Sequence, residues 1–141
     1  MDNTILALAN AIYGEAASED IDTMKMVGSV ALNRLEAGKI DEFGSSMPEV
    51  LQKGFYAVSN PNEPYKQAIS GQFPDKLSET KYKQALSIAS GLVRGTIDRS
   101  KGQFYFTDNE VKKLKGKGKK SFNFDVVKPT GKVGKYNTYS Y

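Results

Sequence analysis

Glu15 is the residue of this sequence whose type and position most clearly allow chemistry. In a helix that turns about 100° per residue, the apolar residues of the first segment form one stripe, and Glu15 falls on its edge. The stripe consists of Ile5, Leu8, Ala9, Ile12 and Ala16. A carboxyl group at that edge is expected to be partly removed from water, which disfavours its ionised form and raises its pKa. A raised pKa suits a general acid that works near neutral pH.

Glu15 also has a simpler interpretation, as a residue at the boundary of the core that pairs with a Lys or an Arg, and helix position alone favours this interpretation.

The composition limits which chemistry the chain can perform. The chain contains neither His nor Cys, which excludes Ser-His-Asp and Cys-His catalysis, zinc-hydrolase chemistry and disulfide bonds. Carboxylates, Lys and Tyr remain for acid-base work, and we predict no metal site and no cofactor.

The length and composition indicate one globular domain over residues 1–141. Hydrophobic residues make up 39% of the chain and charged residues 26%, which is typical of a folded protein of this size. No stretch approaches the roughly 20 apolar residues of a membrane span, and the N-terminus lacks the pattern of a signal peptide. We therefore expect no membrane insertion. The net charge of +4 favours a polyanionic partner, either nucleic acid or an anionic cell wall.

Apolar periodicity predicts three main helices and two short ones. The main helices are expected over residues 4–17, 23–37 and 78–94, and the short ones through residues 50–52 and near residues 65–70. The predicted N-caps are Asn3, Asp22 and Ser46, the last in a capping box with Glu49, and Gly95 lies just past the longest helix. The segment 54–74 is otherwise predicted to be rich in loops. Arg34 lies near an apolar helix face, so we expect it to pair with a carboxylate or a carbonyl inside the fold.

The C-terminal third has a different pattern, with short strands and a basic loop. Residues 103–107 predict an aromatic strand, residues 108–114 one or two helical turns, and the lysine-rich stretch 112–120 a solvated loop. Residues 122–126 and 132–136 are predicted to pair as strands around a turn at 129–131. The predicted fold class is therefore α+β, mainly helical, with a small C-terminal β-hairpin or sheet.

Six segments together resemble the spore-cortex-lytic family of cell-wall hydrolases, which belongs to the lysozyme-like superfamily. The matching segments are residues 8–16, which contain Tyr13-Gly14-Glu15-Ala16, then 27–35, 48–51 with 54–58, 85–95, 102–106 and 133–136. They occur in the order of the family and span nearly the whole chain. The resemblance implies a lysozyme-like single domain that acts on peptidoglycan. It also implies cleavage between N-acetylmuramic acid and N-acetylglucosamine by a lytic-transglycosylase route, with Glu15 at the catalytic position.

A transglycosylase can work with one carboxylate, because the C6 hydroxyl of the muramic acid serves as the nucleophile, whereas ordinary glycosidases use two. The alternative is a muramidase-type hydrolase, in which Glu19, Asp20 or Asp22 would hold a water molecule. We predict instead that these three acidic residues cap a helix or lie in a solvated loop.

The remaining candidate site residues are assigned to substrate binding. Tyr56, Ser59 and Asn60 lie where the family usually has Gln-Phe-Ser, although the sequence here departs from that pattern. Tyr105 is a candidate for the groove, with Phe104 and Phe106 packed inward, unless all three belong to the core. Tyr136 lies near the position where family members often have a His. Phe55 is predicted to be a core residue.

Two alternatives come from other classes of protein. The charge and the lysine stretch are compatible with a nucleic-acid-binding module, but the lysines do not interleave with stacking aromatics. An inactive structural relative, such as a wall-binding part of a phage tail, has no reason to keep Glu15. We expect peptidoglycan glycan strands as the partner, with phage virion proteins as further candidates and no specific nucleic acid. The expected place of action is the bacterial cell wall, reached from a phage virion or by release from the cytoplasm at lysis.

Overall fold

The computed structural model describes residues 3–99, 105–107 and 128–140, and it confirms a mainly helical α+β fold. The helices are α1 (Asn3–Ala16), α2 (Ile21–Glu36), α3 (Ile40–Phe43), α4 (Met47–Gly54), α5 (Tyr56–Ser59), α6 (Glu63–Ser70) and α7 (Lys76–Arg94). The strands are β1 (Tyr105–Thr107), β2 (Lys128–Val133) and β3 (Tyr136–Ser140). Among the described residues, no helix combines the length and the apolar character needed to cross a membrane.

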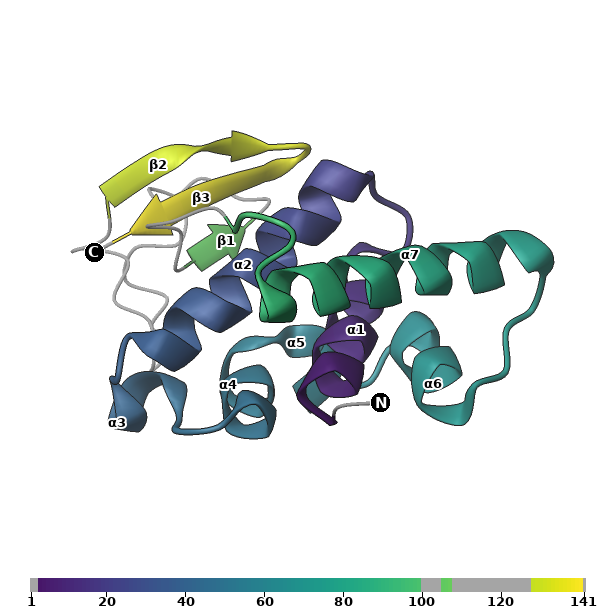
Figure 1. Cartoon of the computed structure of the whole chain (residues 1–141), viewed down its shortest axis with the longest axis horizontal. Helices are drawn as coiled ribbons and strands as arrows, with labels where there is room; N and C mark the ends of the chain where they lie inside the picture. Colours follow the sequence, from purple (N-terminus) through teal and green to yellow (C-terminus); the bar gives the residue numbers. More distant parts are fainter. Residues whose placement is uncertain (1–2, 100–104, 108–127, 141) are drawn as a thin grey trace.

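Helix α1 lies at the centre of the helical part of the molecule. It contacts α2, α4, α5, α6 and α7, and Figure 1 shows α7 passing across it while the sheet lies beside α2. The predicted stripe is buried, but so are Ala11, Tyr13 and Gly14 on other sides of the helix. A helix that is covered on several sides buries more than one face. Glu15 therefore has buried neighbours on more sides than the apolar stripe alone predicts.

Three helix starts differ from the predicted ones, and for α2 and α7 the reason is that a cap, and not apolar periodicity, determines where the helix begins. Asp20, and not Asp22, caps α2 by accepting a hydrogen bond from the Thr23 backbone N–H at 2.9 Å. Helix α7 begins two residues earlier than predicted because Asp75 caps it through the Ser78 N–H at 2.8 Å. Asn3 lies inside α1.

The predicted capping box of α4 is confirmed, since the Glu49 N–H donates to Ser46 Oγ at 3.4 Å. Gly95 ends α7 in the left-handed conformation, as expected of a residue just past the end of a helix.

The segment 54–74 is more helical than predicted, because it contains α5 and because α6 begins two residues before the helix expected near residues 65–70. Helix α3 was not predicted either. Helices of four residues, such as α3 and α5, are too short to show apolar periodicity, and short helices form in proteins because tertiary contacts and caps stabilise them. For α6 the cap is Asn62, whose side chain accepts from the Tyr65 N–H at 2.9 Å.

The small sheet has the order β1-β3-β2 and is antiparallel throughout. The predicted turn at residues 129–131 is wrong, because these residues belong to β2 and the hairpin reverses at Gly134 and Lys135. Gly134 has a φ of +56° and Lys135 does not have a positive φ, as in a type II′ turn. The predicted strand 122–126, the turns 108–114 and the lysine stretch 112–120 lie outside the described residues.

Replacement of Leu8 by Ala tests the central position of α1. Leu8 is fully buried, so Leu8→Ala should lower the free energy of unfolding by about 2–5 kcal/mol through lost burial and the cavity that remains. The measurement is urea denaturation followed by circular dichroism. The matched control is Leu77→Ala in α7, where the side chain is 70% exposed and the change should stay below about 0.5 kcal/mol. Equal effects of the two substitutions would contradict the assignment of the core.

Exchange of Asp75 for Asn tests the charge on the cap of α7. The backbone N–H of Ser78, and then its side chain, hold the pKa of Asp75 below the usual 3.8. A group whose pKa is lowered by folding stabilises the protein above its unfolded pKa, and this contribution is lost as the pH falls through the folded pKa. Asn caps equally well but carries no charge. The melting temperature of the wild type should therefore exceed that of Asp75→Asn near pH 7, and the difference should shrink as the pH falls through the lowered pKa of Asp75 and vanish once its carboxyl group is protonated. A difference that does not change with pH would refute this account.

Candidate active site

Glu15 lies in the last turn of α1 and is half-buried, as predicted. Its Oε1 atom accepts a hydrogen bond from the backbone N–H of Ala57, in the first turn of α5, at 3.0 Å. The backbone N–H groups in the first turn of a helix have no partners within that helix. Phe55, at the N-cap of α5, offers no side-chain acceptor, so the Glu15 carboxylate supplies one from another part of the chain.

The main-chain carbonyls at the end of α1 are also bound by groups from outside the helix. The Asn62 amide donates to the Gly14 carbonyl at 2.8 Å, and the Tyr136 hydroxyl donates to the Glu15 carbonyl at 3.4 Å. The Ala16 carbonyl accepts from the Glu19 N–H at 3.0 Å. The last four carbonyls of any helix lack intrahelical donors. Here the required donors come from the segment before α6, from β3 and from the loop after α1.

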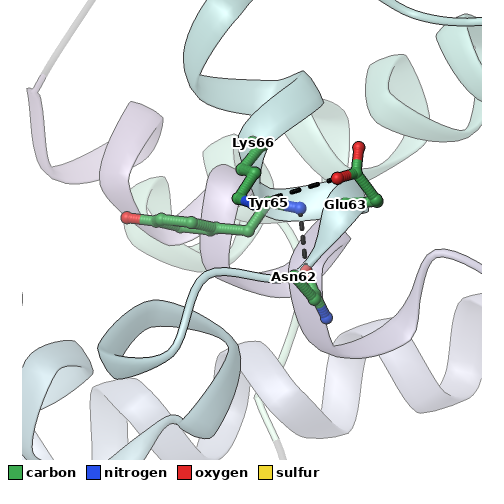
Figure 2. A network of polar contacts seen from close by, with 4 residues as sticks. All are labelled: Asn62, Glu63, Tyr65 and Lys66. Atoms are coloured by element: carbon green, nitrogen blue, oxygen red, sulfur yellow. Dashed lines mark hydrogen bonds and ion pairs between the residues drawn. The ribbon is translucent and has the colours of Figure 1, made fainter.

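Asn62 joins two helix ends with one side chain. Its Oδ1 caps α6 at the Tyr65 N–H, while its Nδ2 donates to the Gly14 carbonyl of α1. Figure 2 shows the Asn62 side chain next to the first turn of α6, with the exposed ion pair between Glu63 and Lys66 on the same turn. The end of α1 and the start of α6 are therefore held together directly beside Glu15.

Gly14 is the residue that allows α5 and α6 to come this close to α1. A Cβ atom at this position would lie 3.1 Å from the Cβ of Tyr65 and 3.2 Å from the Cβ of Ala57. Both are tighter than ordinary van der Waals contacts, and a Cβ atom cannot move away without its backbone. Glycine inside a helix is unfavourable by roughly 1 kcal/mol relative to Ala, so the close packing offsets that cost.

The hairpin of β2 and β3 closes the other side of this region. Lys135 Nζ lies 3.0 Å from Glu19 Oε1, and its ammonium also lies 5.3 Å from the centre of the Tyr136 ring. Gly134 lies against Thr23, since a Cβ at this glycine would be 2.6 Å from Thr23 Oγ1. The C-terminal hairpin thus docks where α1 ends and α2 begins.

The structure brings most of the predicted substrate-binding residues near Glu15. Tyr56 directly precedes Ala57 and is 68% exposed, and Ser59 and Asn60 lie exposed at the other end of α5. Tyr136 reaches the Glu15 main chain through its hydroxyl. For Tyr105 the structure gives the backbone, which pairs with Tyr139, but the side chain lies outside the described part.

The core assignments in the same region are confirmed. Phe55 is buried, and the half-buried ring of Phe106 lies 5.8 Å from that of Phe55 and 5.2 Å from that of Tyr136. Arg34 is also buried and donates to the Gly54 carbonyl at 3.3 Å. Its guanidinium lies 5.2 Å from the centre of the Phe55 ring. Phe104 lies outside the described residues.

Two of the three acidic residues after α1 are engaged in structural contacts. Asp20 caps α2, and the Thr23 N–H that it accepts is the main reason why the pKa of Asp20 is lowered from 3.8. Glu19 pairs with Lys135, and Asp22 lies exposed in the first turn of α2. A carboxylate with a lowered pKa is a weak base, so Asp20 is poorly suited to activate water.

Sequence reasoning missed Asn62, Ala57 and Tyr65. A signal for Asn62 was present, because Asn followed by an acidic residue and then Pro is typical of a helix start. Ala57 contributes only its backbone N–H, which no side-chain pattern can reveal.

Comparison of the chain with protein-family models, with curated proteins and with solved structures finds no match. Within the described part of the chain, no group of three or more His, Cys, Asp or Glu side chains is placed to hold a metal ion. What defines the site is therefore its own geometry, namely a half-buried carboxylate at the end of a buried helix, with tyrosines and amides from other elements around it.

Substitutions of Asn62 test whether the link between α1 and α6 contributes to stability. Asn62→Ala removes both hydrogen bonds and should lower the free energy of unfolding by about 1–2 kcal/mol. Asn62→Asp keeps a capping oxygen but places a second oxygen against the Gly14 carbonyl, so it should destabilise about as much. The readouts are urea denaturation and hydrogen exchange at the Tyr65 amide, which Asn62→Asp should still protect. Asp75→Asn, at a cap that does not bind a second helix, is the comparison variant, and it should lose only the charge contribution described above. Wild-type stability in Asn62→Asp would show that the Gly14 bond contributes nothing.

Proposed function

We propose that this chain is a peptidoglycan-degrading enzyme with a lysozyme-like fold that cleaves the bond between N-acetylmuramic acid and N-acetylglucosamine. The proposed reaction is that of a lytic transglycosylase, with Glu15 as the catalytic residue. One observation carries the proposal: the Glu15 carboxyl group is half-buried and held by the Ala57 N–H at 3.0 Å, at a junction that also presents Tyr56. The sequence resemblance to spore-cortex-lytic hydrolases supports it, and so does the net charge of +4, which suits an anionic wall polymer.

The hydrogen bond from Ala57 fits a group that acts first as acid and then as base. Partial burial favours the protonated carboxyl that the first step requires, and the N–H donor favours the carboxylate that this step leaves behind. A carboxyl group transfers its proton through one oxygen, so the bond to Oε1 is compatible with transfer through Oε2. The same bond restricts the side-chain torsions, which orients the carboxyl group before the substrate arrives.

The reaction then needs no second carboxylate. Glu15 donates its proton to the glycosidic oxygen, the bond from this oxygen to C1 of the muramic acid breaks, and the N-acetylglucosamine leaves with a free 4-hydroxyl. Positive charge develops at C1 as in other glycosidases. The Glu15 carboxylate then takes the proton of the C6 hydroxyl while O6 bonds to C1, which gives a 1,6-anhydro end and restores the protonated acid. The nucleophile belongs to the substrate, so its attack benefits from proximity.

The hydrolytic alternative is less well supported by the same geometry. It requires a carboxylate that positions water across the sugar from Glu15. Asp20 and Glu19 are engaged in the α2 cap and in the pair with Lys135, and recruiting either of them would break a contact that holds the end of α1 or the start of α2. The third candidate, Asp22, is exposed in the first turn of α2.

Digestion of purified peptidoglycan, with mass spectrometry of the fragments, tests the proposal. The wild type should release 1,6-anhydro-muropeptides, and Glu15→Gln should lower the rate by about 10²- to 10⁴-fold because the amide cannot donate a proton as an acid does. The amide oxygen can still accept from the Ala57 N–H, so the melting temperature should change little. Glu15→Ala should lose both activity and stability.

The control for this experiment is Glu63→Gln, the same exchange at a carboxylate whose side chain is 78% exposed in α6, and it should keep full activity. Reducing muramic acid ends in the products would indicate hydrolysis in place of the intramolecular attack. Undiminished cleavage by Glu15→Gln would reject Glu15 as the acid and leave it only its role at the start of α5.

A further inference from the structure

Tyr65 lies where the first turn of α6 meets the end of α1. It lies in the first turn of α6, is half-buried, and its Cβ and Cδ1 atoms lie 3.1 and 3.3 Å from where a Cβ on Gly14 would be. Figure 2 shows its ring extending out from this turn, away from Glu63. The ring therefore leaves α6 at the point where α6 touches the end of α1.

The same glycine places Tyr65 close to the candidate acid. Gly14 precedes Glu15, and the methyl group of Ala57, whose N–H binds the Glu15 carboxylate, lies at the same glycine. Tyr65 and the group that holds Glu15 thus meet α1 at a single residue. A Cβ atom at position 14 would require α5 or α6 to shift by a few tenths of an ångström.

Two hydrogen bonds of Asn62 hold the backbone of Tyr65 in this place. Asn62 Oδ1 accepts from the Tyr65 N–H at 2.9 Å, while its Nδ2 donates to the Gly14 carbonyl at 2.8 Å. The ring is therefore carried by a turn that is tied to α1. A binding surface on such a support loses little conformational entropy when a ligand arrives.

Other tyrosines close to α1 serve the interior. The Tyr13 hydroxyl donates to Gln67 at 3.0 Å and the Tyr82 hydroxyl to Asn10 at 2.6 Å, and their rings meet edge to face at 5.6 Å. Their hydroxyls and ring faces are used within the fold. The half-buried ring of Tyr65 lies against Gly14 and points away from Glu63 (Figure 2).

We propose that Tyr65 is a substrate-binding residue whose ring supports the apolar face of a pyranose unit next to the Glu15 carboxyl group. This inference rests on the proposed function and adds a subsite to it. A pyranose presents C–H groups on one face and hydroxyls at its rim, and a tyrosine matches both, because it has an apolar ring and a polar hydroxyl. The ring would hold one sugar of the glycan strand in place while Glu15 acts on the adjoining bond.

A tryptophan reporter tests this inference directly, because the chain contains no tryptophan. Tyr65→Trp in the Glu15→Gln background introduces a single indole at the proposed subsite, in a protein that should not cleave its ligand. Addition of a peptidoglycan tetrasaccharide should shift the indole emission to shorter wavelength, in a saturable way. The control is Ile69→Trp in the same background, at a side chain of α6 that is 60% exposed, and its emission should not respond.

Calorimetric titration of the same tetrasaccharide into further variants measures what the ring contributes. In the Glu15→Gln background, Tyr65→Phe should bind within about twofold of the parent, and Tyr65→Leu should bind about tenfold more weakly because most of the ring contact is lost. In the otherwise wild-type chain, Tyr65→Leu should raise KM more than it lowers kcat. Gly14→Ala should weaken binding as well, because its methyl group displaces the turn that carries Tyr65.

The outcomes separate this inference from the proposed function. One outcome is that the tetrasaccharide binds, but the emission of the indole at position 65 does not change and Tyr65→Leu keeps full affinity. This outcome would overturn the role of Tyr65 and leave Glu15 as the acid. Binding that is absent from every variant, together with no release of muropeptides by the wild type, would overturn both. If Tyr65→Leu fails to fold, the comparison of the two tryptophan reporters still decides, since only the one at position 65 should respond.

Discussion

The end of a helix leaves carbonyl groups without partners, and in α1 that end lies inside the protein. Exposed carbonyls would bind water, but a buried or half-buried helix end needs donors from elsewhere in the chain. Asn62 and Tyr136 supply donors to Gly14 and Glu15. The arrangement of α6 and β3 around α1 follows from that requirement, and the environment of Glu15 follows from the arrangement.

The same logic operates in reverse at α5. This helix is too short to be stable by itself, and the residue before it offers no side-chain cap. The Glu15 carboxylate accepts one of its free N–H groups. A residue proposed to donate a proton is thus also a structural partner of the helix that carries Tyr56. The Glu15 carboxyl group thus has a structural role and a proposed catalytic role. Glu15→Gln separates the two roles better than Glu15→Ala, because the Gln amide still accepts a hydrogen bond but has no acidic proton.

The long helices were predictable because each buries an apolar face over several turns, and the burial of Glu15 at the edge of such a face follows from the same pattern. Among the short helices, α4 and α6 were predicted near residues 50–52 and 65–70, but α3 and α5 were not. Helix α5 depends on a carboxylate far away in the sequence, which no local pattern reveals. The hairpin was placed wrongly for a related reason. Residues 129–131 and Gly134-Lys135 both allow a turn by local chemistry, and the second is used in a structure where Gly134 docks against Thr23. Arg34 was predicted correctly because a buried guanidinium must find an acceptor, whatever the fold.

The hydrogen bond from the Tyr136 hydroxyl to the Glu15 carbonyl spans 121 positions of the chain. Closing so long a loop costs more entropy than any contact among the helices, and such non-local contacts generally form late in folding. The helices can pack around α1 before the hairpin arrives, because their own contacts are closer in sequence. The surroundings of Glu15 therefore depend on a strand synthesised 121 positions after it, and until Tyr136 is made the Glu15 carbonyl lacks this hydrogen bond.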